Sequence, residues 1–288
     1  MSYLAPGLAI LAAFLFGISV HLQRRASTDV DGLTGTLIAV VTAALLFWCI
    51  GVFVVEWHWF GTKAALIFAL VGLIYPASSQ FMQITALKRV GPALTSALGS
   101  ISPLFAVVPA VIFLGEYVSL QGALGIALMM TGLMLAAVAP KAFRGGWPIW
   151  ALLLPLGASF TRGIVQPITK SGYDILPNPV FATLIMASVS SCVIFLFWMR
   201  PKAVAARAYT GAGLTWFVMA GLMNAIGILA IFAAINLADV AIVAPLVSTS
   251  PLFVLLLGAL IFRNEILRPR HYIVVSLTVI GAILLVSQ

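Results

Sequence analysis

The chain has 288 residues, of which 63% are hydrophobic and 8% are charged, and its formal net charge is +8. Soluble domains carry about 25% charged residues, so this composition cannot cover a soluble surface and predicts a polytopic membrane protein. Nucleic-acid binding is also excluded, because the basic residues lie in short connections between apolar runs and form no basic patch on a water-facing element.

Ten apolar segments are long enough to be membrane-spanning helices, which need roughly 20 residues each. In chain order they cover residues 7–23, 34–55, 64–87, 93–113, 120–139, 149–168, 178–199, 213–235, 240–262 and 271–287. The connections leave no room for a soluble domain or a nucleotide-binding site. Because every backbone amide in lipid needs an internal partner and alternating barrel strands are absent, we predict an all-α integral membrane protein.

The first apolar segment is expected to be retained, since no positive charge precedes it as in a cleaved signal peptide. The two cysteines, Cys49 and Cys192, lie inside apolar segments and are expected to be small packing residues. The sequence indicates no disulfide, no metal site and no cofactor.

One segment of the chain occurs twice. Residues 86–105 read ALKRVGPALTSALGSISPLF, and residues 234–253 read AINLADVAIVAPLVSTSPLF. With one inserted residue the match continues, so that Glu116 aligns with Glu265 and Gly132 with Gly281. The chain therefore divides into two similar units of five helices each, which we assign to residues 1–140 and 147–288.

The basic residues indicate how the two units lie in the membrane, because Lys and Arg accumulate in cytoplasmic loops. In a ten-helix arrangement, twelve of the 15 Lys and Arg residues fall on one side, Lys63 and Lys170 fall on the other, and Arg162 lies inside a helix. Five is an odd number, so consecutive five-helix units must be inverted relative to one another. The charge bias places both termini outside the cytoplasm.

The order of motifs is the same in both units. The first copy shows Ala86-Leu87, Pro103, Leu114-Gly115-Glu116 and Gly132, and the second shows Ala234-Ile235, Pro251, Arg263-Asn264-Glu265 and Gly281. Phe16-Gly17 and Arg162-Gly163 occupy matching places. This pattern resembles the EamA domain of the drug/metabolite transporter superfamily, although the second copy lacks the glycine of the Leu-Gly-Glu turn.

The resemblance covers nearly the whole chain. It implies ten helices in two inverted repeats around a central cavity, and transport, often export, of a small metabolite such as an amino acid. It does not imply a particular substrate, because members of the family differ widely in what they carry.

Arg162 is the residue that most strongly suggests a binding site. It lies in the sixth segment with Ser159 and Gln166 on the same face, and no Asp or Glu lies deep in any segment. Ionisable residues at membrane depth usually face a cavity or a partner. Arg162 could bind a substrate carboxylate through a bidentate pair, or its side chain could extend to the membrane interface.

A polar stripe marks the third segment, where Tyr75, Ser79 and Gln83 follow at four-residue spacing on one helix face. Unpaired polar groups are costly in hydrocarbon, so the stripe should face a cavity or join neighbouring helices. The matching eighth segment has Asn224 as its main polar side chain. We therefore expect an asymmetric cavity with polar and apolar walls.

Pro103 and Pro251 are predicted to interrupt the fourth and ninth helices at equivalent places, each freeing a backbone carbonyl. Hydroxyl groups, including those of Ser100 and Ser248, surround them. These hydroxyls could line the cavity or could satisfy the freed backbone.

Two further ionisable residues have less specific interpretations. His21, near the end of the first segment, could relay protons or could be an interfacial hydrogen-bonding residue. Glu116 lies at a short turn, where capping or pairing with an arginine is favoured over substrate contact.

We predict a secondary transporter in the bacterial inner membrane that exports small organic metabolites such as amino acids or related carboxylates. Nucleoside, sugar or lipid-like cargo is the alternative. A membrane-embedded enzyme is disfavoured, because the three histidines are widely spaced and no deep carboxylate joins them. A non-transporting subunit would need neither paired prolines nor a deep arginine. With no ATP motif, proton coupling, exchange and facilitated diffusion stay open, as do monomer and homodimer.

Overall fold

A computed structural model describes residues 3–90, 94–95, 98–137, 148–200, 211–262 and 269–287. All regular secondary structure among these residues is helical, which confirms the predicted all-α class. Several residues discussed above lie outside the described ranges, among them Glu265 and the basic residues at 141, 144, 202, 207, 263 and 268.

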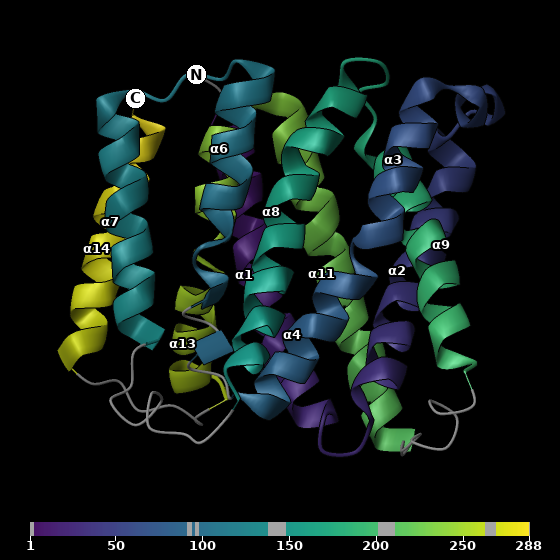
Figure 1. Ribbon diagram of the computed structural model, residues 1–288, viewed down its shortest axis with the longest axis horizontal. Coiled ribbons are helices and arrows are strands. Elements are labelled where there is room, and N and C mark those ends of the chain that lie inside the picture. The colour runs from purple at the N-terminus through teal and green to yellow at the C-terminus, as the bar shows by residue number, and fades with distance from the viewer. Residues whose placement is uncertain are drawn as a thin grey trace.

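The helices stand side by side in a bundle, with both chain ends at one edge (Figure 1). Those of the first half are α1 (Leu4–Ala26), α2 (Gly32–Val54), η1 (Trp57–Gly61), α3 (Lys63–Ile74), α4 (Ala77–Arg89), α6 (Ser102–Leu114) and α7 (Leu120–Ala137). Those of the second half are η3 (Ile149–Leu152), α8 (Leu153–Tyr173), α9 (Pro179–Trp198), α11 (Gly211–Leu237), α12 (Val240–Val247), α13 (Ser250–Leu260) and α14 (Pro269–Val286).

Six helical stretches among the described residues are long and apolar enough to cross a membrane. Three shorter apolar helices accompany them, in α6, α7 and α14. Large apolar side chains cover much of the outside, for example Phe53 and Phe113, which are 87% and 80% exposed. Such a surface belongs in lipid, and the protein is therefore an integral, multi-pass membrane protein.

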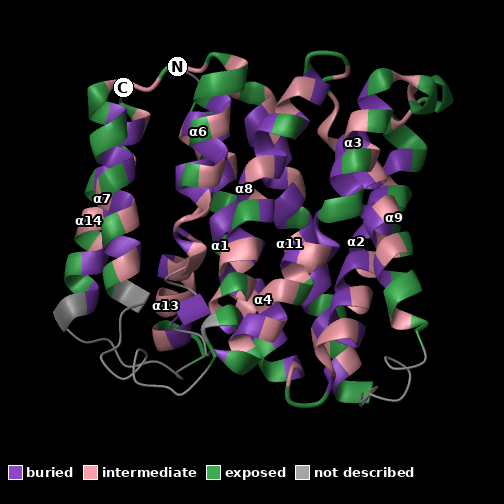
Figure 2. Ribbon diagram, viewed as in Figure 1, coloured by how far each residue is buried: buried purple, intermediate pink, exposed green. Residues whose placement is uncertain are grey.

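Buried residues concentrate where helices face one another, and exposed residues lie on the outer faces of the bundle (Figure 2). Cys49 and Cys192 are free and exposed, so the expectation that they pack inside the protein is wrong. Both lie on apolar helices, where a sequence pattern without strong amphipathicity cannot tell the outer face from the inner one.

The second helix of each half begins with the same device. The Asp31 carboxylate accepts hydrogen bonds from the backbone N–H groups of Leu33 and Thr34 at 3.0 and 2.9 Å. The Asn178 side-chain oxygen accepts one from the N–H of Phe181 at 2.9 Å. Asp31 and Asn178 therefore cap α2 and α9. Matching the two cap residues gives a residue-by-residue correspondence between these helices.

Equivalent glycines also make equivalent contacts in the two halves. A Cβ atom added to Gly17 in α1 would lie 2.9 Å from the Cβ of Phe253 in α13. A Cβ atom added to Gly163 in α8 would lie 2.5 Å from the Cβ of Phe105 in α6. Each glycine thus lets a first helix approach the backbone of a half-helix in the opposite unit.

The pair α7 and α14 packs mainly on itself and stands apart from the rest of the bundle (Figure 1). A Cβ atom on Gly125 would lie 2.7 Å from the carbonyl oxygen of Gly281, and one on Gly132 would lie 3.2 Å from that of Val274. Seven residues forward along α7 correspond to seven residues backward along α14, so these two helices run antiparallel.

Three of the predicted helices differ from their expected form. The third segment is not continuous, because it divides into α3 and α4 around Tyr75 and Pro76. The ninth divides into α12 and α13 around Ser248 and Thr249. The sixth begins as the short helix η3 and then continues in α8 to Tyr173, five residues beyond the predicted end at 168.

Candidate functional site

The break between α3 and α4 lies in the middle of the bundle. Proline has no N–H to donate and pushes the residue before it into an extended conformation. Tyr75 accordingly has φ −128° and ψ 140°, and the Tyr75–Pro76 peptide bond is cis. The next N–H, that of Ala77, donates to the hydroxyl oxygen of Ser190 in α9 at 2.9 Å. The expected single stripe from Tyr75 to Gln83 is therefore wrong at its first member, since Tyr75 precedes the helix that carries the other two.

Arg162 lies near the centre of α8, because that helix is longer than predicted. At 1.5 Å per residue the nearer helix end is roughly 14 Å away, which makes extension to the interface less favourable than the sequence suggested. The side chain is half-buried, and its Nε–H donates to the carbonyl oxygen of Ala158 at 3.2 Å. No carboxylate in the described part of the chain forms an ion pair with it.

The helix break is a second feature of this region. Tyr75, which caps the C-terminal end of α3, is near enough to interact electrostatically with Arg162. The C-terminal end of a helix carries partial negative charge on its unpaired carbonyl groups. A guanidinium near such a helix end costs less than one beside an unbroken helix, at a depth where charged groups are rare.

Gln166 lies one turn further along α8 and is buried. Its Nε2 donates to the carbonyl oxygen of Arg162 at 3.1 Å, while its Oε1 is buried and has no hydrogen-bond partner among the described residues. Buried acceptors are nearly always paired, and an unpaired one costs about 1–3 kcal/mol. A ligand donor beside Arg162 would relieve that cost.

The side chains around Arg162 and Gln166 are partly polar and partly aromatic. Tyr75 is buried and meets the ring of Phe232 edge-on, with centroids 6.4 Å apart. Ser79 donates to the carbonyl oxygen of Ala158 at 3.4 Å, so α4 follows α8 at this level. Gln83 is half-buried and makes no hydrogen bond to the described residues.

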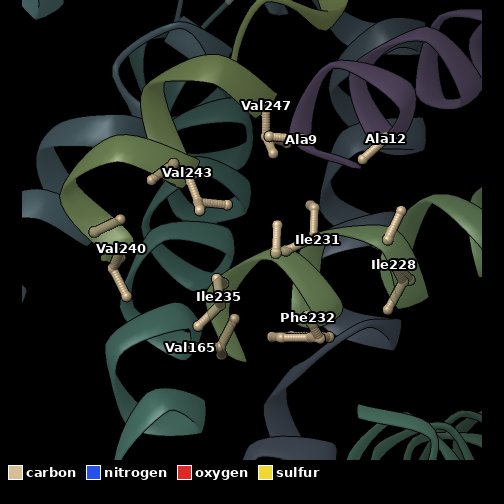
Figure 3. Close-up of a cluster of buried hydrophobic side chains, with 14 of the residues drawn as sticks. Ala9, Ala12, Val165, Ile228, Ile231, Phe232, Ile235, Val240, Val243 and Val247 are labelled. Atoms are coloured by element: carbon tan, nitrogen blue, oxygen red, sulfur yellow. The ribbon is translucent and has the colours of Figure 1, made fainter. Parts of the chain in front are cut away.

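Buried apolar side chains of α1, α8, α11 and α12 converge in a packed cluster (Figure 3). Val165 of α8 and Ile235 of α11 lie next to one another there. The half-helix α12 is enclosed almost completely, with Val240, Val243 and Leu246 all fully buried. Polar groups thus lie on one side of this region and a packed apolar cluster on the other, and the asymmetric cavity expected from the sequence stays a prediction.

Several predicted site residues donate hydrogen bonds to backbone carbonyl groups. Ser159 lies with its Oγ 2.9 Å from the carbonyl oxygens of both Leu98 and Pro155, and it is fully buried. Ser248 donates to the carbonyl oxygen of Pro245 at 2.6 Å. Ser100 is buried as well. The interpretation in which hydroxyls satisfy the backbone and join helices fits Ser159 and Ser248 better than cavity lining.

Pro103 and Pro251 do not lie in helix interiors. They occupy the first turn of α6 and of α13, where the missing N–H would have no intrahelical partner. The predicted interruptions are present, since a turn at residues 100–101 precedes α6 and α12 ends at Val247 before α13 begins at Ser250. The expectation that each proline removes a hydrogen bond from a helix interior is wrong. Both instead mark the start of a half-helix at equivalent places.

Asn224 and His21 lie in different surroundings. Asn224 is half-buried on α11 and makes no hydrogen bond to the described residues. His21 donates from Nε2 to the carbonyl oxygen of Val254 in α13 at 2.8 Å and stacks on Phe262 at 4.4 Å. The bond to Val254 therefore joins α1 to α13. The Nδ1 of His21 is buried and has no partner among the described residues.

Two residues missed in the sequence complete the arrangement. Ser190 supplies the acceptor at the helix break, and Phe232 packs on Tyr75. The serines Ser188, Ser190 and Ser191 within an apolar helix were a signal that could have indicated a polar contact there. Nothing in the sequence distinguishes Phe232 from other aromatic residues. Within the described ranges, no three His, Cys, Asp or Glu side chains lie close enough to hold a metal ion.

Comparison with known proteins decides the family. A model of the EamA-like transporter family matches residues 4–138 and again residues 149–287. The chain belongs to the EamA-like transporter family. The resemblance inferred from the repeated motifs is thereby confirmed.

The similar proteins agree with this assignment. A curated relative from Sinorhizobium sp, named "Uncharacterized transporter in cobO 3'region", is 34% identical over 147 residues, which are 48% of this chain and 95% of the relative. A solved structure, described as "Crystal structure of protein", covers 99% of this chain and 96% of its own at TM-score 0.77 and 15% identity, a likeness of fold alone. This EamA-like protein is therefore a membrane transporter, and a transporter acts on a small-molecule substrate.

Proposed function

We propose that this EamA-like protein crosses the bacterial inner membrane ten times, in two inverted five-helix units at residues 1–140 and 147–288. The antiparallel packing of α7 on α14 supports this, as do the equivalent contacts of Gly17 and Gly163. Arg24, Arg25, Lys88 and Arg89 at the ends of α1 and α4 carry the charge bias that favours both termini outside the cytoplasm.

The substrate in this proposal is a small organic metabolite with a carboxylate, such as an amino acid, and it is exported. The observation that carries the proposal is Arg162 in the middle of α8, which forms no ion pair with a carboxylate among the described residues. The end of α3 and the Oε1 of Gln166, which has no described partner, lie near it. A bidentate pair with the guanidinium would bind the carboxylate. The Gln166 oxygen could accept a hydrogen bond from a donor of the same substrate.

Transport proceeds by rocking of one unit against the other around this site. Contacts between the units exist at both edges of the bundle. At the edge with the chain ends, the Glu116 carboxylate accepts hydrogen bonds from the N–H groups of Val240 and Ala241 at 2.9 and 2.8 Å. At the other edge, the guanidinium of Arg25 stacks on Trp216. Alternating access requires these contacts to break in turn.

Flux measurements in proteoliposomes test the proposal. A panel of amino acids, other carboxylates, nucleosides and sugars is offered with and without a pH gradient, and we expect carboxylates to be transported. Arg162→Ala should weaken binding of the transported carboxylate by about 10- to 100-fold, because hydrogen bonds to charged groups contribute about 1.5–3 kcal/mol. Arg162→Lys keeps the charge but loses the planar guanidinium that can form two parallel hydrogen bonds to a carboxylate. Binding of the transported carboxylate should therefore be weakened in this variant as well.

Lys63→Ala is the matched control, because Lys63 is an exposed cation at the start of α3, far along the helix from Tyr75. It should leave flux unchanged. Transport of nucleosides or sugars with no carboxylate flux would overturn the proposal and favour the alternative cargo. If Arg162→Lys bound the transported carboxylate with wild-type affinity, Arg162 would not be a substrate-binding residue.

A further inference from the structure

An apolar groove of about 380 Å³ separates two helices that follow one another in the chain, α6 and α7. These helices make almost no direct contact, because α7 packs on α14. All side chains that line the groove are apolar, among them Leu104, Val108 and Ile112 of α6 and Ala123, Ala127 and Met130 of α7.

The groove opens toward the membrane. Leu104, Val108 and Ile112 are 42%, 50% and 66% exposed although they lie on a membrane helix. An apolar cavity of this kind does not hold water, since water needs polar partners. The medium that meets these side chains is the hydrocarbon of the bilayer, which is the environment of a multi-pass membrane protein.

The dimensions match one lipid chain in one leaflet. From Leu104 to Ile112 the groove follows α6 for roughly 12 Å at 1.5 Å per residue, and it continues to Val118. One leaflet contributes about half of the ~30 Å hydrocarbon thickness. A methylene group takes about the same space as a water molecule, ~30 Å³, so the groove accommodates roughly a dozen methylene groups.

The two ends of the groove differ in a way that orients the chain. One end lies at Leu104, beside Pro103 at the mid-bundle start of α6. The other end lies at Val118, in the turn between α6 and α7 where Tyr117 is 81% exposed. Exposed tyrosines are typical of the membrane–water interface, so the headgroup belongs at this end.

We propose that an acyl chain of a bilayer phospholipid occupies the groove between α6 and α7, with its terminal methyl group toward Leu104 and its headgroup toward Tyr117. The chain fills the space that separates the α7–α14 pair from the half-helix α6. Because lipid tails are as apolar as the groove, its retention comes from dispersion contacts on both walls, which a chain lying on a convex helix face cannot make. This inference is independent of the substrate.

A photoreactive phospholipid tests it. The full-length protein is placed in vesicles of palmitoyl-oleoyl phosphatidylglycerol containing a phosphatidylcholine with a diazirine near the end of one acyl chain. After irradiation, mass spectrometry of peptides locates the cross-links. Residues 104–112 and 123–130 should be labelled at least about threefold more than the outer face of α2 at Leu45, which is 62% exposed and near the middle of that helix, because the groove offers contacts on two sides.

Ala127→Trp fills the groove and should reduce this labelling to the level of the α2 face. Leu124→Trp is the matched control, because Leu124 lies on the same helix at nearly the same depth, is 54% exposed, and does not line the groove. It should leave the labelling unchanged. Ala123→Phe is a second filling variant in case the first does not fold. Labelling of the groove equal to that of α2, or insensitive to both filling variants, overturns the proposal.

Discussion

Arg162 and Phe16 occupy equivalent positions in the two units, next to the equivalent glycines Gly163 and Gly17, yet their surroundings differ. Arg162 lies beside a third helix that is broken at Pro76. Phe16 lies beside an eighth helix, α11, that is continuous and contacts the Phe16 ring at Gly227. The duplicated segment aligns Pro76 with Asn224 in α11, so one copy lost the residue that breaks the helix or the other gained it.

The difference extends to the neighbouring helix. The caps Asp31 and Asn178 align Ser190 of α9 with Ala43 of α2. Ser190 accepts the N–H of Ala77 at the break, whereas Ala43 packs with Ala225, the counterpart of Ala77, in an apolar cluster. In this repeated scaffold the deep cation therefore coincides with a broken helix and its polar partner, and a broken helix ends in carbonyl groups without intrahelical partners.

The strongest test of this comparison places an arginine at the equivalent position of the other unit, beside the unbroken helix. Phe16→Arg should destabilise the protein by about 2.5–3.5 kcal/mol, the cost of an arginine at mid-membrane depth, because unbroken α11 offers no free carbonyl groups. Unfolding in mixed detergent micelles measures the loss.

Phe16→Leu is the control for lost aromatic packing, and it should cost less than about 1.5 kcal/mol. If Phe16→Arg were as stable as the wild type, the broken helix would not be what permits Arg162.

A smaller difference should separate the two glycines. Gly163→Ala should destabilise the protein by about 1–3 kcal/mol and more than Gly17→Ala does, because it overpacks a tighter contact. The new Cβ would lie 2.5 Å from the Cβ of Phe105 and 2.7 Å from the carbonyl oxygen of Ser102, against 2.9 Å from the Cβ of Phe253 for Gly17. Thermal unfolding of the purified variants ranks them.

Gly7→Ala on α1 is the matched control, since a Cβ atom there meets nothing within 4 Å. It should be neutral or stabilising by up to about 1 kcal/mol, through the higher helix propensity of alanine. An equal loss for Gly163→Ala and Gly17→Ala would show that the two interfaces are equally tolerant.

The smallest effect is expected at the partner of the helix break. Ser190→Ala removes the acceptor of the Ala77 N–H, and side-chain hydrogen bonds within membrane proteins contribute about 0.6–1.7 kcal/mol. The same unfolding measurement reports the loss.

Ser190→Thr retains the hydroxyl and should recover most of the stability. Ala43→Ser makes the reciprocal change beside unbroken α11, where no backbone N–H needs an acceptor, and should bring no gain. A stabilising Ala43→Ser would contradict the proposed asymmetry.

The sequence predicted well the features that depend on nearby residues. The apolar run at 7–23 corresponds to α1 (Leu4–Ala26), and the other predicted segments are mainly helical where they are described, apart from the breaks reported above. The two family matches cover both copies of the duplicated segment. Glu116, predicted to cap or pair and not to bind substrate, caps α12 through two backbone N–H groups.

The candidate site was predicted less well, because its polar groups could choose among several partners. Arg162 and Gln166 were correctly placed on one helix face, as their four-residue spacing requires. Ser159 was expected beside them but bonds to Leu98 and Pro155. A hydroxyl near a half-helix can donate its hydrogen bond to a ligand or to a backbone carbonyl group, and the sequence does not specify which of the two it does.

The sequence by itself determined the membrane class, the apolar helices and the duplication, because apolar length and repeated motifs are read along the chain. Only the tertiary structure decided that the third helix breaks at Tyr75 and that this break lies near Arg162, 87 positions further on. The N–H of Ala77 at the break bonds to Ser190 of α9, and Arg162 comes from α8. Those partners come together through helix packing, which the spacing of residues along the chain does not specify.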